Sequence, residues 1–239
     1  FLYNGGPGSA TLWLQMGSVG PVRGETADAA YTAPAPYKVV SNQYSLLDKT
    51  DLVFIDAMGT GFSKIIGKDD GGVGTGKDFF GVDEDAKAFA QFIYDYVSHN
   101  DRWNSPKFLM GQSYGTTRSA ALVDYQEEHD NMDFNGVILV SSILDFETAS
   151  FNAGNDEPYI LYLPTYAATA CYHKVVQCPA DLPAYLQQVR DCATGAYANA
   201  LIKGDTLTTQ ERKTVWSRLA QYTGLSQDYL NKANLRVSL

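Results

Sequence analysis

The chain has 239 residues, 45% of them hydrophobic and 19% charged, which is enough apolar content for a large folded core and too much for a disordered chain. The formal net charge is −9 and no Lys/Arg run is present, which argues against a nucleic-acid partner because neutralising phosphates requires clustered cations. No apolar stretch approaches the roughly 18 residues that a membrane span needs. We therefore expect a folded protein that binds neither nucleic acid nor membrane.

The first 150 residues alternate between strand and helix patterns. Short apolar runs alternate with segments whose apolar residues recur at helical spacing. The predicted elements are a strand at 1–3, a Pro- and Gly-rich surface excursion over 20–37, a strand buried on both faces at 52–55, a helix over 83–98, a strand at 107–110, a helix over 114–128 and a strand at 137–140. This alternation predicts a parallel sheet flanked by helices, so residues 1–150 form an α/β domain.

The alternation stops after residue 150. Four prolines interrupt the segment over 155–183, namely Pro158, Pro164, Pro179 and Pro183. Three helical patterns follow. The first has an apolar face from Leu186 to Leu201, the second runs from a capping box at Thr208 and Glu211 to Gly224, and the third begins at Ser226. Residues 151–239 therefore form a helical region, which is either a packed appendage or a lid inserted between strands.

Three cysteines lie in the last third of the chain: Cys171, Cys178 and Cys192. They are consistent with one disulfide and a leftover thiol, or with no disulfide at all. A zinc site formed with His173 is a weaker alternative, because the spacing matches no familiar tetrahedral pattern. We expect no metal ion and no organic cofactor.

The sharpest local motif is Gly111-Gln112-Ser113-Tyr114-Gly115, which lies where a predicted strand meets a predicted helix. This is the context of the G-x-S-x-G nucleophile elbow, in which Ser113 occupies a strained turn and the flanking glycines avoid collisions. A nucleophilic serine that attacks a carbonyl needs two backbone N–H donors for the oxyanion. The N–H of Tyr114 at the helix start supplies one of them.

The second donor must come from a loop that leaves another strand. The opening stretch Asn4-Gly5-Gly6-Pro7-Gly8 is such a loop, since its glycines permit close backbone approach. A phosphate-binding loop is the rival interpretation, but the stretch lacks the Gly-Lys-Ser/Thr ending of that motif. A purely structural tight turn is the other alternative.

Three motifs in this order resemble the signature of the serine carboxypeptidases, peptidase family S10, and the helical region from residue 155 onward resembles the inserted lid of these enzymes, closest to the bacterial members. The three motifs are the Asn4–Gly8 stretch, Gly59-Thr60-Gly61-Phe62-Ser63 after Asp56, and the Gly111–Gly115 elbow. The resemblance implies an α/β-hydrolase fold, with residues 1–150 as a partial core and 151–239 as an inserted helical lid. It also implies hydrolysis of C-terminal residues from peptides with a free C-terminus, in a secreted or periplasmic location.

The resemblance also implies roles for individual residues. Ser113 would be the acylated nucleophile, and the N–H groups of Gly6 and Tyr114 would form the oxyanion hole. The Asn4 side chain and the Gly5 N–H would bind the substrate's terminal carboxylate, with Gln112 beside them. An amide donor next to the oxyanion site is well suited to a carboxylate one residue beyond the scissile bond.

The sequence departs from the family pattern at three positions. Gln112 and Ser18 replace a pair of glutamates that binds the carboxylate through a shared proton, and Ser9 replaces a cysteine that often forms a disulfide. Because a glutamine donates a hydrogen bond without titrating, we expect activity that extends to neutral pH.

The remaining members of a Ser-Asp-His triad have no clear counterpart. His99 and His129 end predicted helices, where a cation is favourable, and His173 lies in the predicted lid. Asp145 follows a strand, but such an Asp more often caps a turn. We therefore expect residues 1–239 to be an incomplete part of the fold, with the catalytic Asp and His after Leu239 or on a second polypeptide segment.

Two other functions fit the same motifs. An esterase or acyltransferase of this fold would use the same serine, and only the substrate's C-terminal carboxylate separates it from a carboxypeptidase. A catalytically inactive scaffold is the third alternative, although a strained serine has no physical reason to persist in one.

Overall fold

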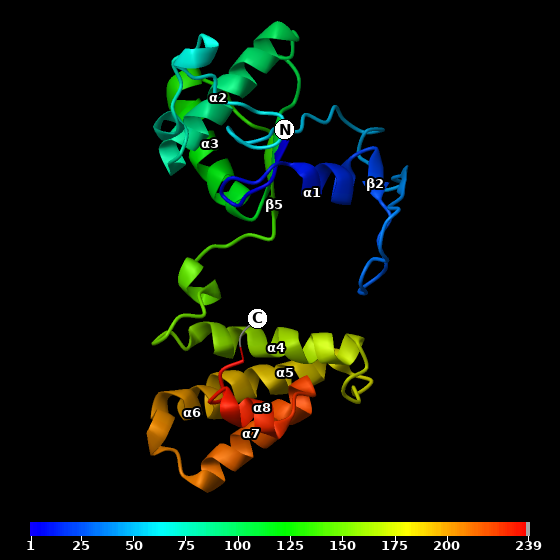
Figure 1. Cartoon of the computed structure of the whole chain (residues 1–239), viewed down its shortest axis with the longest axis vertical. Helices are drawn as coiled ribbons and strands as arrows, with labels where there is room; N and C mark the ends of the chain where they lie inside the picture. Colours follow the sequence, from blue (N-terminus) through cyan, green and yellow to red (C-terminus); the bar gives the residue numbers. More distant parts are fainter. Residues whose placement is uncertain (238–239) are drawn as a thin grey trace. The chain divides into compact units, whose positions relative to one another are not determined.

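The computed structural model describes residues 1–237, and the chain divides into two compact units (Figure 1). Unit 1 is Phe1–Ile143, and unit 2 begins at Leu144. Over residues 1–237, no helix combines the length and the apolar character needed to cross a membrane.

Unit 1 contains a three-stranded parallel sheet with the strand order β1-β4-β5. Its strands are β1 (Leu2–Tyr3), β4 (Phe108–Gln112) and β5 (Gly136–Val140). Parallel neighbours need long crossover connections, and helices supply them here. The predicted strands at 107–110 and 137–140 are confirmed within two residues.

Helices α2 (Val82–His99) and α3 (Tyr114–Asp130) pack against each other and against the sheet (Figure 1). Both predicted helices are confirmed. The apolar side chains at helical spacing in α2 are buried, and with residues of β1, β4 and α3 they form the core of unit 1. The largest members of this core include Tyr3, Phe89, Ile93, Leu109 and Leu122.

The predicted strand at 52–55 is reduced to a single parallel bridge between Leu2 and Phe54. Leu2 N–H donates to the Val53 carbonyl at 2.8 Å, and Ile55 N–H donates to the Leu2 carbonyl at 2.9 Å. The prediction that this run is buried on both faces is wrong, since only Ile55 is fully buried. Leu52 and Val53 instead line an open pocket.

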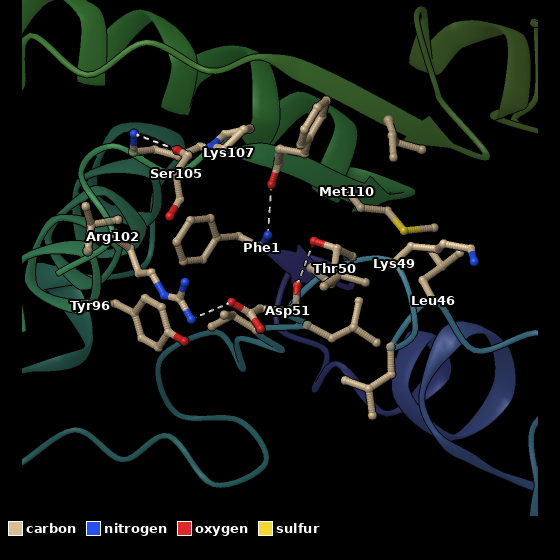
Figure 2. Close-up of a pocket in the computed structure, with 18 of the residues that line it drawn as sticks. Phe1, Leu46, Lys49, Thr50, Asp51, Tyr96, Arg102, Ser105, Lys107 and Met110 are labelled. Atoms are coloured by element: carbon tan, nitrogen blue, oxygen red, sulfur yellow. Dashed lines mark hydrogen bonds and ion pairs between the residues drawn. The ribbon is translucent and has the colours of Figure 1, made fainter. Parts of the chain in front are cut away.

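That pocket, about 770 Å³ in volume, lies beside the amino end of β4 (Figure 2). Phe1, Phe108, Met110 and Ile138 contribute apolar lining from the strands. At the sheet edge, the β5 side chains Val137, Ile138 and Leu139 are 42–53% exposed. Unit 1, as far as residues 1–143 show, therefore has apolar sheet surface with no element packed over it.

The chain after β1 forms α1 (Leu12–Leu14) and a π-helical turn, Gln15–Val19. A small antiparallel pair follows, β2 (Val22–Gly24) with β3 (Val39–Ser41). The expected surface excursion over 20–37 therefore begins in a strand, and the residues between the two strands are mostly exposed.

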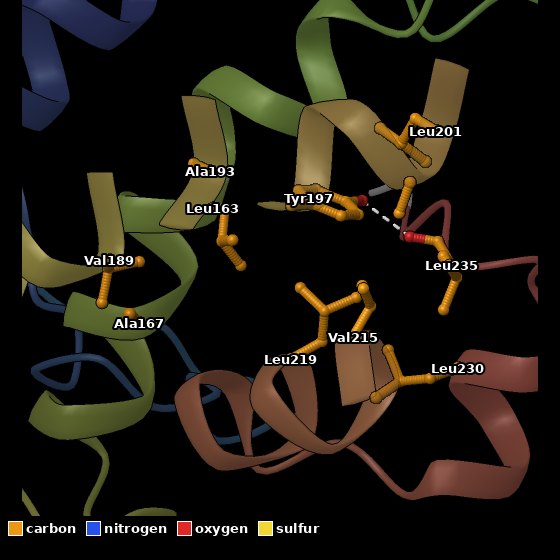
Figure 3. Packing of buried hydrophobic residues seen from close by; sticks show 11 residues of the cluster. Leu163, Ala167, Val189, Ala193, Tyr197, Leu201, Val215, Leu219, Leu230 and Leu235 are labelled. Carbon is orange, nitrogen blue, oxygen red and sulfur yellow. Dashed lines mark hydrogen bonds between the residues drawn. The ribbon is translucent and has the colours of Figure 1, made fainter. Parts of the chain in front are cut away.

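Unit 2 is helical and encloses its own apolar core (Figure 3). Its helices are α4 (Glu157–Tyr172), α5 (Leu182–Cys192), α6 (Ala198–Lys203), α7 (Thr209–Thr223) and α8 (Gln227–Lys232), with a π-helical turn at Ala193–Tyr197. The fully buried Tyr197 donates from its hydroxyl to the Leu235 carbonyl at 2.6 Å, so the one polar atom of this ring is satisfied.

The predicted caps in unit 2 are confirmed. Thr208 and Glu211 form the capping box of α7, Ser226 caps α8, and Gly224 ends α7 at a φ of 71°. The hydrogen bond from Lys203, followed by those from the N–H and hydroxyl of Thr208, lowers the pKa of Glu211 to about 2. The cap therefore keeps its ionised carboxylate well into the acidic range.

The prediction that prolines interrupt the segment over 155–183 is wrong for its first half. Pro158 lies in the first turn of α4, where its missing N–H costs no helical hydrogen bond. Pro164 lies inside the helix and removes one such bond. The burial of Leu163 and Ala167 in the core of unit 2 stabilises the helix on both sides of it.

The cysteine alternatives are resolved by the structure. Cys171 and Cys178 form a disulfide, and Cys192 is a free thiol. The zinc alternative with His173 is contradicted, because two of its four groups are bonded to each other.

Candidate active site

Ser113 lies on the turn between β4 and α3, with φ 59° and ψ −123°. A non-glycine residue in this left-handed region carries strain of roughly 1–3 kcal/mol. Hydrogen bonds hold the turn from both sides: Ser113 N–H donates to the Val140 carbonyl at 2.9 Å, and Thr116 N–H and Oγ1 donate to the Ser113 carbonyl at 2.9 and 2.8 Å. The strained strand-to-helix turn that the motif predicts is present.

The two glycines of the elbow have the steric role that the motif predicts. A Cβ on Gly111 would lie 2.7 Å from Ser119 Oγ and would overlap the Gly115 carbonyl. A Cβ on Gly115 would lie 3.0 Å from the Tyr3 carbonyl. Both positions are closed to larger residues because strand, helix and β1 meet there.

The Asn4–Gly8 loop lies directly against the elbow. A Cβ on Gly5 would lie 2.6 Å from the Gln112 carbonyl and 2.8 Å from Gly115 N, and it would overlap Tyr114 N. Gly6 follows at a φ of 113°. Over residues 1–237, neither Gly5 N–H nor Gly6 N–H donates a hydrogen bond; Gly5 is buried and Gly6 is exposed.

Two of the predicted substrate-binding side chains contact each other across the site. Asn4 is buried, and its Nδ2 donates to Gln112 Oε1 at 2.7 Å. Leu14 N–H donates to Asn4 Oδ1 at 3.2 Å, which fixes the orientation of the amide. The structure thus brings Asn4, Gly5 and Gln112 together beside Ser113 and Tyr114.

The carboxylate of Asp56 joins two loops at the site, a role that the sequence interpretation missed. It accepts from Thr11 N–H at 2.7 Å and from Phe62 N–H at 2.9 Å. A Cβ on Gly61 would overlap this carboxylate. The Gly59–Ser63 motif therefore winds around Asp56, and the same carboxylate anchors the chain that follows the Asn4–Gly8 loop.

The guanidinium of Arg118 on α3 is a second element that the sequence interpretation missed. Its side chain is 1% exposed, and it donates from Nε and Nη2 to the Asp85 carboxylate at 2.7 and 3.2 Å. Its Nη1 donates to the Asn4 carbonyl at 2.7 Å. Burial, and next the charge of Asp85, raise the pKa of the nearby Tyr114 hydroxyl.

None of the three histidines hydrogen-bonds to Ser113 in the part of the chain that the structure describes. His99 and His129 end α2 and α3, and each donates from Nδ1 to a carbonyl of its own helix. His173 follows α4 in unit 2. Asp145 accepts from Glu147 N–H at 2.9 Å, which confirms its expected role as a turn cap.

The pocket of Figure 2 is separate from this site. Its β4 residues are Phe108 and Met110, whereas Ser113 follows the carboxyl end of that strand and is not among the lining residues. Within residues 1–237, no group of three or more His, Cys, Asp or Glu side chains is arranged to hold a metal ion.

A strained serine between a parallel strand and a helix, with a glycine-rich loop from a second strand packed against the same turn, is typical of the α/β-hydrolase class. The family model of the serine carboxypeptidases, Peptidase S10, matches residues 2–237, and the chain belongs to this family. The resemblance inferred from the three motifs is thereby confirmed. The special likeness to bacterial members stays a prediction.

Among solved structures, Kex1(delta)p, a prohormone-processing carboxypeptidase from Saccharomyces cerevisiae, is similar at 20% sequence identity with a TM-score of 0.48. The match covers 93% of this chain and 44% of that one. The chain thus spans less than half the length of this relative. A search of curated proteins gives no match.

Proposed function

We propose that this chain carries the nucleophile and the carboxylate-binding site of a serine carboxypeptidase that acts on peptides with a free C-terminus. The observation that carries the proposal is the contact between the Asn4–Gly6 loop and the elbow at Ser113. It supports the proposal because the proposed oxyanion donor, Gly6 N–H, and the proposed carboxylate donor, Gly5 N–H, are one peptide unit apart. Neither a metal ion nor an organic cofactor takes part.

In the acylation step, Ser113 Oγ forms a bond to the scissile carbonyl carbon while its proton passes to a general base. The N–H groups of Gly6 and Tyr114 stabilise the oxyanion that forms. The C–N bond then breaks, the leaving amine takes the proton, and the C-terminal amino acid departs. Water attacks the acyl-enzyme in the same way and restores the serine hydroxyl.

Recognition of the chain end uses the neighbouring donors. Gln112 Oε1 is occupied by Asn4 Nδ2, so the NH₂ of Gln112 is left to donate. With the Gly5 N–H, it forms a neutral site for one carboxylate. An internal peptide bond offers no carboxylate there, which accounts for selective cleavage at the C-terminus.

The general base and the rest of the sheet are supplied by a further polypeptide segment, in the same chain or in a second one. The support for this is the apolar surface of β4 and β5, because parallel sheets are normally covered on both faces. We assign residues 151–239 to the inserted helical lid that the family resemblance implies. The Cys171–Cys178 disulfide favours a secreted or periplasmic location.

Paired substrates test the proposed function. The full gene product should cleave a blocked dipeptide with a free C-terminal carboxylate and should reject the C-terminally amidated form by roughly 100-fold or more in kcat/KM, because the buried donors would lack their acceptor. Equal cleavage of both forms would favour the esterase or acyltransferase alternative. Cleavage of neither, with no labelling by a fluorophosphonate, would favour the inactive scaffold.

Because the proposed carboxylate site is neutral, it should cause no loss of activity as the pH rises from 5 to 7. In Gln112→Glu, the substrate carboxylate binds well only while the new side chain is protonated, so kcat/KM should fall by about tenfold per pH unit above the pKa of the glutamate. Profiles of kcat/KM against pH for both proteins test this. A steep loss from pH 5 to 7 in the unmodified protein would contradict it.

A further inference from the structure

We propose that Arg118 is a positioning residue that fixes the Asn4–Gly5 peptide group so that its N–H faces the substrate carboxylate. The inference rests on the proposed function and adds to it a residue whose buried side chain acts through the Asn4–Gly5 peptide group. Its basis is that Arg118 binds the carbonyl of the very peptide group whose N–H is the proposed donor.

The geometry of the Asn4–Gly5 peptide group links the Arg118 contact at the Asn4 carbonyl to the direction of the Gly5 N–H. The Asn4–Gly5 bond is trans, since the cis bonds of residues 1–237 are Gly6–Pro7 and Ala35–Pro36. In a trans peptide, C=O and N–H point in opposite directions. Holding the Asn4 carbonyl toward the interior at 2.7 Å from Arg118 Nη1 therefore directs the Gly5 N–H away from the interior, toward the site.

Arg118 is itself held rigidly enough to serve this purpose. Asp85 accepts two of its hydrogen bonds, and the guanidinium carbon lies 4.1 Å from the centre of the Phe89 ring. Both partners belong to α2, whereas Arg118 belongs to α3. The guanidinium plane is thus fixed by a carboxylate and a ring, and its third nitrogen, Nη1, donates to the Asn4 carbonyl.

A glycine at position 5 makes such a restraint necessary. Without a Cβ, Gly5 can rotate about φ with little steric resistance, and the Asn4–Gly5 peptide could turn over. The reversed plane would direct the Asn4 carbonyl oxygen toward the substrate carboxylate and repel it. A charge-assisted hydrogen bond to that oxygen opposes the reversal, and it also polarises the amide toward stronger N–H donation.

A purely structural role for the buried ion pair makes a different prediction. Loss of an ion pair that only joins α2 and α3 would lower the stability and the active fraction, and it would affect every substrate alike. Loss of the positioned N–H should affect substrates that carry the carboxylate and spare those that lack it. The comparison between two substrates with the same acyl group therefore separates the two roles.

The test uses the full gene product with the Arg118→Met substitution, and Arg190→Met, at an exposed arginine of α5, as the matched control. The substrates are a blocked dipeptide with a free carboxylate and the methyl ester of the same blocked amino acid. We expect Arg118→Met to lose roughly 10- to 100-fold in kcat/KM on the dipeptide, mainly through KM, and less than about threefold on the ester. Arg190→Met should match the unmodified protein on both. Equal losses on the two substrates would overturn the inference.

Because Arg118→Met leaves the partly buried Asp85 carboxylate without its cation, two further variants control for a loss of folding. Arg118→Lys keeps a cation, and Asp85→Leu/Arg118→Met removes both charges. Each should show the same selective loss on the dipeptide after the active fraction is counted by fluorophosphonate titration. Suppose that the unmodified protein cleaves dipeptides while these variants keep its ratio of kcat/KM on the dipeptide to kcat/KM on the ester. That result would refute the positioning role of Arg118 and leave the proposed function standing. If the unmodified protein rejects dipeptides, the proposed function fails as well.

Discussion

Replacement of Ser113 by alanine is expected to abolish the fluorophosphonate adduct and to lower kcat for peptide hydrolysis by about 10⁴-fold or more. The hydroxyl is the atom that forms the acyl-enzyme, and no other group on the elbow can take its place. The fold should survive, because the hydrogen bonds that hold the turn use the backbone of Ser113 and not its side chain.

Intact-mass measurement before and after treatment with the reagent, together with steady-state kinetics, tests this expectation. Ser217→Ala, at an exposed serine of α7, is the matched control and should label and cleave like the unmodified protein. Retention of the adduct in Ser113→Ala would place the nucleophile elsewhere and would refute the assignment.

Substitution of Gly5 by alanine should lower kcat by roughly 10²- to 10³-fold, the cost of losing an oxyanion donor. The new methyl group would meet the Gln112 carbonyl at 2.6 Å and Gly115 N at 2.8 Å. These are backbone atoms of the elbow, so no side chain can rotate away and the loop itself must shift. The neighbouring Gly6 N–H would move with it.

Gly195→Ala is the matched control, because a Cβ there meets no atom within 4 Å. Both variants should be compared by kcat after titration of the active fraction, and by thermal unfolding. A Gly5→Ala protein that keeps kcat within a few-fold of the unmodified protein would show that the loop does not supply the oxyanion donor.

The elements with strong local signals could be predicted from the sequence. Helix α2 repeats its apolar residues at helical spacing, and the elbow strand and helix flank a recognisable motif. Helix α4 was missed because Pro158 and Pro164 dominate its local pattern, whereas tertiary packing of Leu163 and Ala167 decides the outcome. The predicted strand at 52–55 is longer than the single bridge that the structure shows. The sequence alone does not show how many other strands a given strand pairs with.

The residues of the candidate site could be proposed from the sequence, but the side chains that hold them in place could not. Ser113 and the loop at Asn4–Gly6 stand in contiguous motifs, so local reasoning finds them. Arg118 and Asp85 are 33 residues apart and are matched only through the packing of two helices. Asp56 accepts hydrogen bonds from two loops, but its place at the end of a short apolar run indicates only a strand boundary.

The separation in sequence of the two halves of the site has a consequence for the order of folding. Asn4 and Gln112 are 108 residues apart, and the pairing of β1 with β4 spans a similar distance. Unit 2 is built mainly from helices that contact near neighbours in the chain, such as α4 with α5 and α7 with α8. Because local contacts form faster than distant ones, helical structure should appear early in refolding. The Asn4–Gly8 loop should reach Ser113 only in the last steps, when β1 pairs with β4.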